Sequence, residues 1–377
     1  MFALAWKFIR FDKAKSVGII TAIVISIFLI GQQVGLLLFL MGLMGNLVGN
    51  ANVKDNQIWV IESQTQNANT LTKIDLRYVQ QLQSINGVEQ AFPVVIGNAE
   101  AKFLDGNTAA VQIIGSDAPD FVIGPNPTRI FQGNLSDLSL PEGVSVEFFN
   151  AKSWNTDLYL NKQIELNSKS AQVKLITKNA QAFGGNYVYT NLFNARFYGN
   201  VDPSKVSLIV LNLDKNSNKQ NVINLINSQY PNLRAWDTKA LQNSTVKEIL
   251  ISSNMGMSFG TLVVFAMISG FFIIGLTLYS SALDRVKDYG TLKAIGANKT
   301  YVNKLLITQA LLYALIGFSV AFLLLIGFSQ GVKKSGLEIN FSLGFVSFLL
   351  GITLFISIGG SLFAVRKISK LEPASVF

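Results

Sequence analysis

Long uncharged and apolar runs lie near both ends of the chain and enclose a stretch with ordinary polar patterning. Asp, Glu, Lys and Arg are absent from residues 16–53, 249–283, 305–332 and 339–365. Each run exceeds the ~20 residues that a helix needs to cross the hydrocarbon core of a bilayer. The pattern therefore predicts a membrane α-helical bundle with four transmembrane helices, one before the polar stretch and three after it. The first run is too long for a signal peptide and lacks a small-residue cleavage site, so we expect a retained anchor.

The polar stretch has the pattern of a folded α+β domain. Its β-rich runs and helical spacings follow the order β-α-β-β, then a long interruption, then β-α-β. This order resembles a split β-α-β, ferredoxin-like unit with a β-rich lobe inserted at residues 116–205. The expected elements of the unit are strands at 58–62, 88–103, 108–115, 206–213 and 233–236 and helices at 75–85 and 220–228. The expected strands of the lobe are 144–149, 163–166 and 172–177.

The second apolar run continues a helical pattern that begins in the polar stretch. Residues 239–248 have helical spacing and lead directly into residues 249–283. We therefore predict one continuous helix over residues 239–283, which would act as a stiff lever between the outer domain and the membrane.

Basic residues are concentrated in three short segments beside the predicted membrane helices. The chain has 31 Lys and Arg against 22 Asp and Glu, which gives a net charge of +9. Residues 54–248 are balanced, so the excess lies in residues 1–16, 284–304 and 366–377. The positive-inside rule places these segments in the cytoplasm and the large domain in the periplasm or outside the cell. The basic charge is therefore a topology signal, and we expect no nucleic-acid partner.

These patterns predict a multi-pass protein of the inner (plasma) membrane with both termini in the cytoplasm. The predicted segments are an N-terminal cytoplasmic segment (1–16), a first membrane helix with an outer extension (17–48), the extracytoplasmic domain (49–248), a second membrane helix with an outer stalk (249–283), a cytoplasmic loop (284–304), a third membrane helix (305–332), an outer turn (333–338), a fourth membrane helix (339–365) and a cytoplasmic tail (366–377).

Composition excludes several kinds of chemistry. The chain has no Cys and no His, which removes disulfides, Cys/His metal sites, thiol nucleophiles and Ser-His-Asp triads. It contains no G-x-x-x-x-G-K-[ST] phosphate-binding loop, and Gly331-Val332-Lys333-Lys334-Ser335 is only a superficial match. We therefore predict no catalytic residues, no metal site and no enzymatic activity for this chain.

The loop between the second and third membrane helices carries the most informative motif. It reads Asp284-Arg285-Val286-Lys287-Asp288-Tyr289-Gly290 and then, after three residues, Ala294-Ile295-Gly296-Ala297. Topology alone explains a solvated and positively charged loop here. The order of acidic, basic and small residues, however, favours a functional interpretation.

This loop strongly resembles the signature of the FtsX-like and MacB-like permeases of ABC transporters, in which an acid-Arg-x-basic-acid-x-Gly run leads into an Ala-x-Gly-Ala turn. The resemblance makes the following residues a candidate ATPase-coupling loop: Asp284, Arg285, Lys287, Asp288, Gly290, Lys293, Ala294, Gly296 and Ala297. The tail from Arg366 to Ala374 resembles the family's closing basic and Leu-acid-Pro ending. The order of one span, a large outer domain and three spans is also the family's layout. The sequences of residues 289–294 and of Gly87-Val88-Glu89 most resemble the DevC-like branch of the family.

The resemblance implies a permease subunit that transmits ATP-driven conformational change across the inner membrane to its outer domain, in a tripartite efflux or export system. The implied partners are an ABC ATPase subunit, a second permease copy in a homodimer, a periplasmic adaptor, an outer-membrane channel and membrane lipids. ATP and Mg would bind to the ATPase, and this chain would bind no cofactor. Lipoprotein release and control of cell-wall hydrolases stay open as alternatives. A membrane-anchored receptor or sensor is the alternative from another class, but the cytoplasmic segments are short for an output domain.

Two further patterns concern packing. Gly31 and Gly35, and likewise Gly256 and Gly260, are small residues four apart in the first two membrane helices, where they let helices approach closely. An aromatic cluster in the inserted lobe is expected to be core rather than an interaction face. Its members are Phe183, Tyr187, Tyr189, Phe193, Phe197 and Tyr198.

Overall fold

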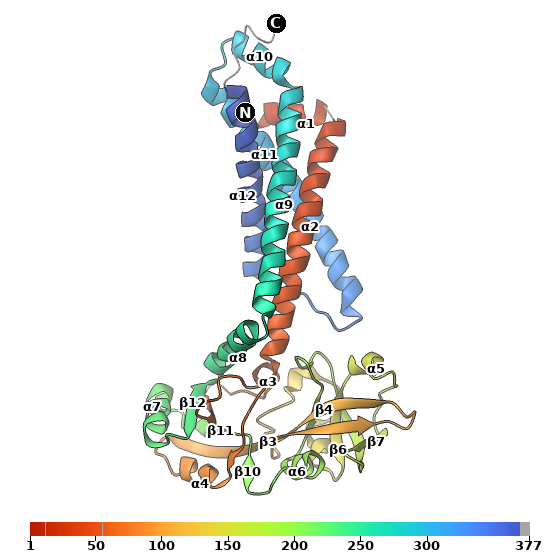
Figure 1. The fold of residues 1–377 in the computed structure, drawn as a ribbon, viewed down its shortest axis with the longest axis vertical. Helices are drawn as coiled ribbons and strands as arrows, with labels where there is room; N and C mark the ends of the chain where they lie inside the picture. The colour runs from red at the N-terminus through yellow and green to blue at the C-terminus, as the bar shows by residue number, and fades with distance from the viewer. Residues whose placement is uncertain (12, 55, 370–377) are drawn as a thin grey trace. The chain divides into compact units, whose positions relative to one another are not determined.

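The computed structural model describes residues 1–11, 13–54 and 56–369. The chain forms two compact units (Figure 1). The membrane unit comprises Met1–Phe39 and Gly256–Phe377, and the β-rich unit comprises Leu40–Met255. The Leu-acid-Pro part of the predicted family ending, residues 371–374, lies outside the described residues.

The membrane unit is helical. Its helices are α1 (Phe2–Phe11), α2 (Lys13–Met44, whose last turn belongs to the β-rich unit), α9 (Met255–Asp284), α10 (Val286–Ala294), α11 (Lys299–Lys333) and α12 (Leu343–Ser369). Within the described residues, four helices are long and apolar enough to cross a membrane: α2, α9, α11 and the Leu343–Leu362 part of α12. This confirms the predicted class, a membrane helical bundle with one helix before the β-rich unit and three after it. Helix α1, which lies within the predicted N-terminal segment, runs crosswise to α2 (Figure 1).

Small residues allow the membrane helices to approach closely. A Cβ on Gly31 would lie 2.5 Å from Leu325 Cδ1, so this glycine of the predicted pair packs within the unit. The tightest backbone approach joins α9 and α12, because a Cβ on Gly360 would lie 2.7 Å from the Cα of Gly275. Gly260, by contrast, has no atom within 4 Å of an added Cβ, so its face of α9 is open in this chain.

The β-rich unit contains two lobes. Its elements are α3 (Asn46–Gly49), β1 (Gln57–Glu62), β2 (Ile74–Asp75), α4 (Arg77–Gln83), β3 (Val88–Lys102), β4 (Thr108–Gly115), η1 (Pro127–Arg129), β5 (Ile130–Gly133), η2 (Leu135–Ser139), β6 (Gly143–Glu147), α5 (Asn150–Ser153), β7 (Gln163–Leu166), β8 (Lys169–Thr177), β9 (Tyr187–Thr190), α6 (Leu192–Gly199), β10 (Lys205–Val206), β11 (Leu208–Leu213), α7 (Lys219–Gln229), β12 (Leu233–Asp237) and α8 (Thr238–Ser252).

The first lobe has the predicted ferredoxin-like topology. Strands β12, β1, β11 and β3 lie in that order and all neighbours are antiparallel, while α4 and α7 connect β1 to β3 and β11 to β12. Residues 58–61 of β1 are all apolar, as expected for a strand that is covered on both faces of the sheet. Ile58 and Val60 pack in the cluster that contains residues of α4 and α7, whereas Trp59 packs on the other side with residues of α3 and α8.

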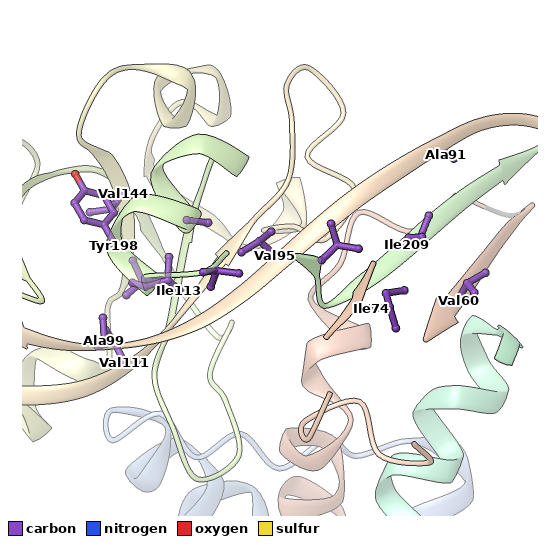
Figure 2. Close-up of a cluster of buried hydrophobic side chains, with 14 of the residues drawn as sticks. Val60, Ile74, Ala91, Val95, Ala99, Val111, Ile113, Val144, Tyr198 and Ile209 are labelled. Carbon is purple, nitrogen blue, oxygen red and sulfur yellow. The ribbon is translucent and has the colours of Figure 1, made fainter. Parts of the chain in front are cut away.

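The long strand β3 joins the two lobes, and it shows that the predicted start of the insertion is wrong. The part of β3 up to Val94 pairs with β11, and the part from Val95 onward pairs with β4. Strand β4 also pairs with β9, so it belongs to the inserted lobe and not to the ferredoxin-like unit. The insertion therefore begins within β3 and not at residue 116. One hydrophobic cluster, which includes Val95 and Ala99, runs through both lobes (Figure 2).

The predicted continuous helix over residues 239–283 is interrupted. Helix α8 ends at Ser252, helix α9 begins at Met255, and Asn254 between them has a left-handed backbone with φ of 54°. Asparagine is one of the few residues that adopts this conformation readily. Helix α8 packs on the β-rich unit through Leu241 and Thr245, which are 0% and 1% exposed. The stalk is therefore part of the β-rich unit and is separate from the membrane helix.

The predicted aromatic core is only half correct. Tyr187, Tyr189 and Tyr198 are buried, as expected for core residues. Phe193 and Phe197, however, are 76% and 48% exposed on helix α6. The two rings lie one helical turn apart on the exposed side of α6. The other side of α6 packs against β3 and β4.

Candidate coupling site

The segment between the second and third membrane helices folds into the short helix α10 and a tight turn. Gly296 has φ of 103°, and the backbone N–H groups of Gly296 and Ala297 donate to the carbonyls of Lys293 (3.1 Å) and Leu292 (2.9 Å). This is the usual way in which a glycine ends a helix, because glycine adopts positive φ without strain. The next helix, α11, begins immediately, and the Asn298 side chain accepts a hydrogen bond from the Tyr301 N–H (2.7 Å).

One face of α10 is buried and centres on Tyr289, which is 1% exposed. Its ring stacks on Phe8 of α1, with centroids 6.0 Å apart and an interplanar angle of 9°. Its hydroxyl donates to Gln309 Oε1 of α11 at 3.1 Å. Burial raises the pKa of Tyr289 to about 12, so the phenol keeps its proton and acts as a donor at neutral pH. A single side chain thus connects α10 to both α1 and α11.

Arg285, just before α10, forms a second connection to α1. It is 7% exposed, its Nη1 donates to the Phe8 carbonyl at 3.0 Å, and its guanidinium lies 5.6 Å from the centroid of the Phe8 ring. Helix α1 is held in turn by Ser16, whose hydroxyl donates to the Ile9 carbonyl (2.7 Å) and contacts the Tyr313 hydroxyl (2.9 Å). The exposed Lys15–Asp284 pair at 3.3 Å adds little, because solvent screens it.

The opposite face of α10 is exposed. Lys287, Thr291 and Ile295 follow at intervals of four residues, so they lie along one side of the helix. Ile295 is 76% exposed, although an isoleucine is usually buried. Helix α10 therefore has one face fixed to the membrane unit and one face available for a partner, with an apolar side chain at its end.

The structure divides the predicted coupling residues between these two faces. Arg285 and Gly290 are buried, Lys293 and Ala297 are half-buried, and the remaining members are exposed: Asp284, Lys287, Asp288, Ala294 and Gly296. Burial and the neighbouring Lys299 lower the pKa of Lys293. Among the described residues, no group of three or more Asp and Glu side chains is placed to hold a metal ion.

Sequence reasoning missed the residues that hold α10 in place. In the sequence, Phe8 lies in a basic terminal segment, and Tyr289 stands out only as part of the loop motif. Two signals were present. Gln309 is an amide inside an apolar run and needs a buried partner, and Ala5 and Ile9 form an apolar stripe on α1 at a helical spacing of four.

Comparison with known proteins agrees with this site. Residues 260–373, which contain α10 and the last three membrane helices, match the family model described as the FtsX-like permease C-terminal domain. The match confirms the resemblance to FtsX-like permeases. Residues 260–373 are therefore similar to the C-terminal domain of FtsX-like permeases. No curated protein matches the chain.

Two solved structures are similar to the β-rich part of the chain at low identity. The periplasmic region of MacB from Actinobacillus actinomycetemcomitans is 9% identical, with a TM-score of 0.38, and the match covers 51% of this chain and 94% of that one. The extracellular domain of the noncanonic ABC-type transporter YknZ from Gram-positive bacteria is 10% identical, with a TM-score of 0.35, and the match covers 48% of this chain and 100% of that one.

Proposed function

We propose that this chain is the permease subunit of an ABC transporter and that a separate ATPase docks on the exposed face of α10. The observation that carries the proposal is the two-faced packing of this helix. Tyr289 and Arg285 fix one face to α1 and α11, while Lys287 and Ile295 point away from the bundle. An exposed apolar side chain beside charged residues is typical of an anchor in a protein interface.

The connections of α10 suggest how motion leaves the loop. Movement of α10 pulls on α1 through Phe8 and on α11 through Gln309, because both contacts are buried and directional. Cooperative movement of packed helices is the usual form of such a transition. ATP and Mg belong to the ATPase in this proposal, and the chain itself is not an enzyme. Its sequence supports this because it contains no phosphate-binding loop.

The proposal includes the cytoplasmic location of α10 and of both termini at the inner membrane, which the positive charge of these segments supports. Helix α1 suits a position at the lipid surface. Phe2 and Trp6 are exposed beside Lys7 and Arg10, the composition of an interfacial amphipathic helix. A homodimer is the proposed assembly, and the open face of α9 at Gly260 supports it.

We also propose that the outer unit works in an export or efflux assembly with an adaptor and an outer-membrane channel. The exposed rings of Phe193 and Phe197, together with Leu140 at 45% exposure, support a protein contact on the inserted lobe. Lipoprotein release and control of cell-wall hydrolases remain the alternative roles. Membership of the DevC-like branch stays a prediction from the sequence of residues 289–294.

The docking proposal is tested by Ile295→Gln, with Leu104→Gln as the matched control. Both residues are exposed and apolar, at 76% and 82%, and Leu104 lies in the turn between β3 and β4. Burial of an isoleucine in an interface contributes about 1.5–3 kcal/mol, so the substitution should weaken binding of the cognate ATPase about 10- to 100-fold. Binding is measured with the full-length chain in nanodiscs. Unchanged binding and ATPase stimulation in Ile295→Gln would refute docking at this face.

A further inference from the structure

Two adjoining hollows on the β-rich unit share part of their lining, and together they are called the cleft here. Their volumes are about 740 Å³ and about 450 Å³, which lie in the range of small-molecule sites. Both are lined by Asn69, Thr70, Asn98 and Gln112, so these residues stand where the two hollows meet. All of the lining residues belong to the β-rich unit. Neither hollow contains a residue of the coupling site.

Side-chain amides are the most frequent polar groups in the lining of the cleft. Six Asn and Gln residues surround it: Asn67, Asn69, Asn98, Gln112, Asn167 and Asn200. The ionisable side chains among the lining residues are one acid, Glu100, and one base, Lys73, so their charges balance. Lys73 donates to the Ile96 carbonyl at 2.9 Å, so one of its donors is already used within the fold.

Some of these amides are fixed in the fold and form preorganised walls. Asn167 donates to the Tyr198 carbonyl at 2.8 Å and accepts from the Glu100 N–H at 3.0 Å. Asn69 donates to the Met44 carbonyl at 2.8 Å and accepts from the Tyr187 hydroxyl at 3.2 Å. Walls that are already ordered lose little conformational entropy when a ligand binds.

Other amides are available to a ligand. Asn98 on β3 and Gln112 on β4 are opposite each other in the strand register, so their side chains lie next to each other on one face of the sheet. Across the described part of the chain, the side chain of neither residue forms a hydrogen bond within the protein. Each amide offers two donor hydrogens and a carbonyl acceptor. The pair therefore presents a floor that both donates and accepts.

The shape and charge of the cleft exclude several ligand classes. A balanced lining provides no net attraction for an anion or a cation. An extended peptide would need a free strand edge, but Gln112 of β4 is paired with Asn98 of β3 on one side and with Tyr187 of β9 on the other, so β4 has no free edge at this position. An acyl chain would displace water from the amides and could not replace the hydrogen bonds that the amides make with water.

A neutral sugar matches what remains. Its hydroxyls donate and accept, as amides do, and its ring carries an apolar C–H face. Phe183 lines the larger hollow, and its aromatic ring can stack on the apolar face of a sugar. The next two residues, Gly184 and Gly185, are exposed and have no atom within 4 Å of an added Cβ, so this loop has room to adjust.

We propose that this amide-lined cleft binds an uncharged oligosaccharide, with Asn98 and Gln112 as the hydrogen-bonding floor and Phe183 as the stacking ring. The site is separate from the coupling helix α10, and it does not depend on the docking of an ATPase. It assigns to the β-rich unit a ligand of its own in addition to protein partners.

The test uses the full-length chain in nanodiscs, because sugar-based detergents would compete for the site. The probes are neutral trisaccharides of glucose and of N-acetylglucosamine, with a trisaccharide of galacturonic acid as the anionic probe, and binding is measured by calorimetry. The proposal expects saturable binding of at least one neutral probe and at least 10-fold weaker binding of the acidic one. A soluble polymer of the bound sugar is then compared with the trisaccharide. Stronger binding of the polymer per chain end indicates that the ligand is a wall glycan, and equal binding indicates a free oligosaccharide. Both results support the site.

The variants place the binding in the cleft. Asn98→Ala with Gln112→Ala should weaken binding at least 10-fold, and Phe183→Ala should weaken it several-fold. Gln132→Ala removes an exposed amide from β5, outside the cleft, and should bind normally. An unchanged melting temperature shows that each variant is folded. Absence of neutral-sugar binding up to several millimolar, binding that survives the double substitution, or preference for an uncharged peptide over the sugars would overturn the proposal.

Discussion

The buried contact between Tyr289 and Gln309 gives a sharp test of how α10 is held. Tyr289→Phe removes only the hydroxyl and keeps the ring that stacks on Phe8. Gln309 Oε1 then loses its donor at 3.1 Å, in a position where Tyr289 is 1% exposed and Gln309 is 7% exposed. The other amide atom, Gln309 Nε2, is also buried and has no partner among the described residues. The substitution therefore leaves the whole amide unsatisfied.

A buried polar group without a partner costs about 1–3 kcal/mol, whereas removing both partners together is nearly neutral. We therefore expect Tyr289→Phe to lower the free energy of opening of α10 by about 1–3 kcal/mol. Because 1.4 kcal/mol is a factor of ten, the amides of α10 should exchange with solvent about 5- to 150-fold faster. The double variant Tyr289→Phe with Gln309→Leu should recover most of the protection, because neither polar group then remains.

Hydrogen exchange of the full-length chain in nanodiscs measures this protection helix by helix. The expected result is faster exchange confined to residues 286–294 in Tyr289→Phe, recovery in the double variant, and an interaction energy of at least 0.5 kcal/mol in the double-mutant cycle. ATPase stimulation should fall with the loss of protection and recover with it. If exchange in α10 is the same in Tyr289→Phe and the unmodified chain, the hydroxyl does not hold the helix and the proposed connection to α11 is wrong.

Two further predictions concern packing and topology. Gly360→Ala should destabilise the membrane unit by about 1–3 kcal/mol, because the new Cβ meets the Gly275 backbone at 2.7 Å. The control Gly351→Ala should be neutral, because no atom lies within 4 Å of its new Cβ. Equal thermal stability of the two variants would contradict the close approach of α9 and α12. Thr291→Cys gives a single thiol, because the chain has no cysteine, on the exposed face of α10. An impermeant thiol reagent should label it in inverted vesicles and not in intact spheroplasts, and the reverse pattern would overturn the orientation.

The elements that sequence predicted well are those whose signal is local and strong. The four membrane helices follow from long uncharged runs, which no other structure accommodates. The ferredoxin-like unit followed from β1, which is apolar on both faces, and from α7, whose Val222, Ile223 and Ile226 repeat at helical spacing. The turn that ends α10 was marked by Gly296, the residue type that tolerates the φ of 103° found there.

The parts that sequence could not predict depend on contacts between distant residues. Nothing near β4 shows that it pairs with the second half of β3 and with β9, because strand partners are set by tertiary packing. The same holds for Phe8 and Tyr289, which are 281 positions apart along the chain and stack across two helices. The break at Asn254 was missed for a different reason. Asparagine adopts positive φ more readily than most residues, but it also occurs inside helices, so only the φ found at this position reveals the interruption.

The interruption changes which helix can act as a lever between the units. Helix α8 is fixed on the β-rich unit, where the Thr245 hydroxyl accepts from the Ala68 N–H at 2.9 Å, and it is separated from α9 by the left-handed Asn254. Helix α2, in contrast, continues without a break from Lys13 to Met44 and passes the boundary between the units at Phe39 and Leu40. An unbroken helix transmits bending and rotation, whereas a non-helical joint absorbs them. We therefore expect transmission to depend on α2 rather than on the 239–283 segment.

A comparison of two positions tests this expectation. Leu40→Pro removes a backbone hydrogen bond and clashes with the preceding turn of α2, at a cost of about 3 kcal/mol or more, while Leu40→Ala keeps the helix. Asn254→Gly keeps the positive φ of the joint and makes it more flexible. In reconstituted vesicles, Leu40→Pro should uncouple ATP hydrolysis from transport at least 10-fold while the ATPase still co-purifies. Leu40→Ala and Asn254→Gly should stay within about 2-fold of the unmodified chain, because the joint is already non-helical. Strong uncoupling by Asn254→Gly, or normal transport by a folded and inserted Leu40→Pro variant, would show that α2 is not the lever and that the connection through α8 and α9 carries the motion despite its break.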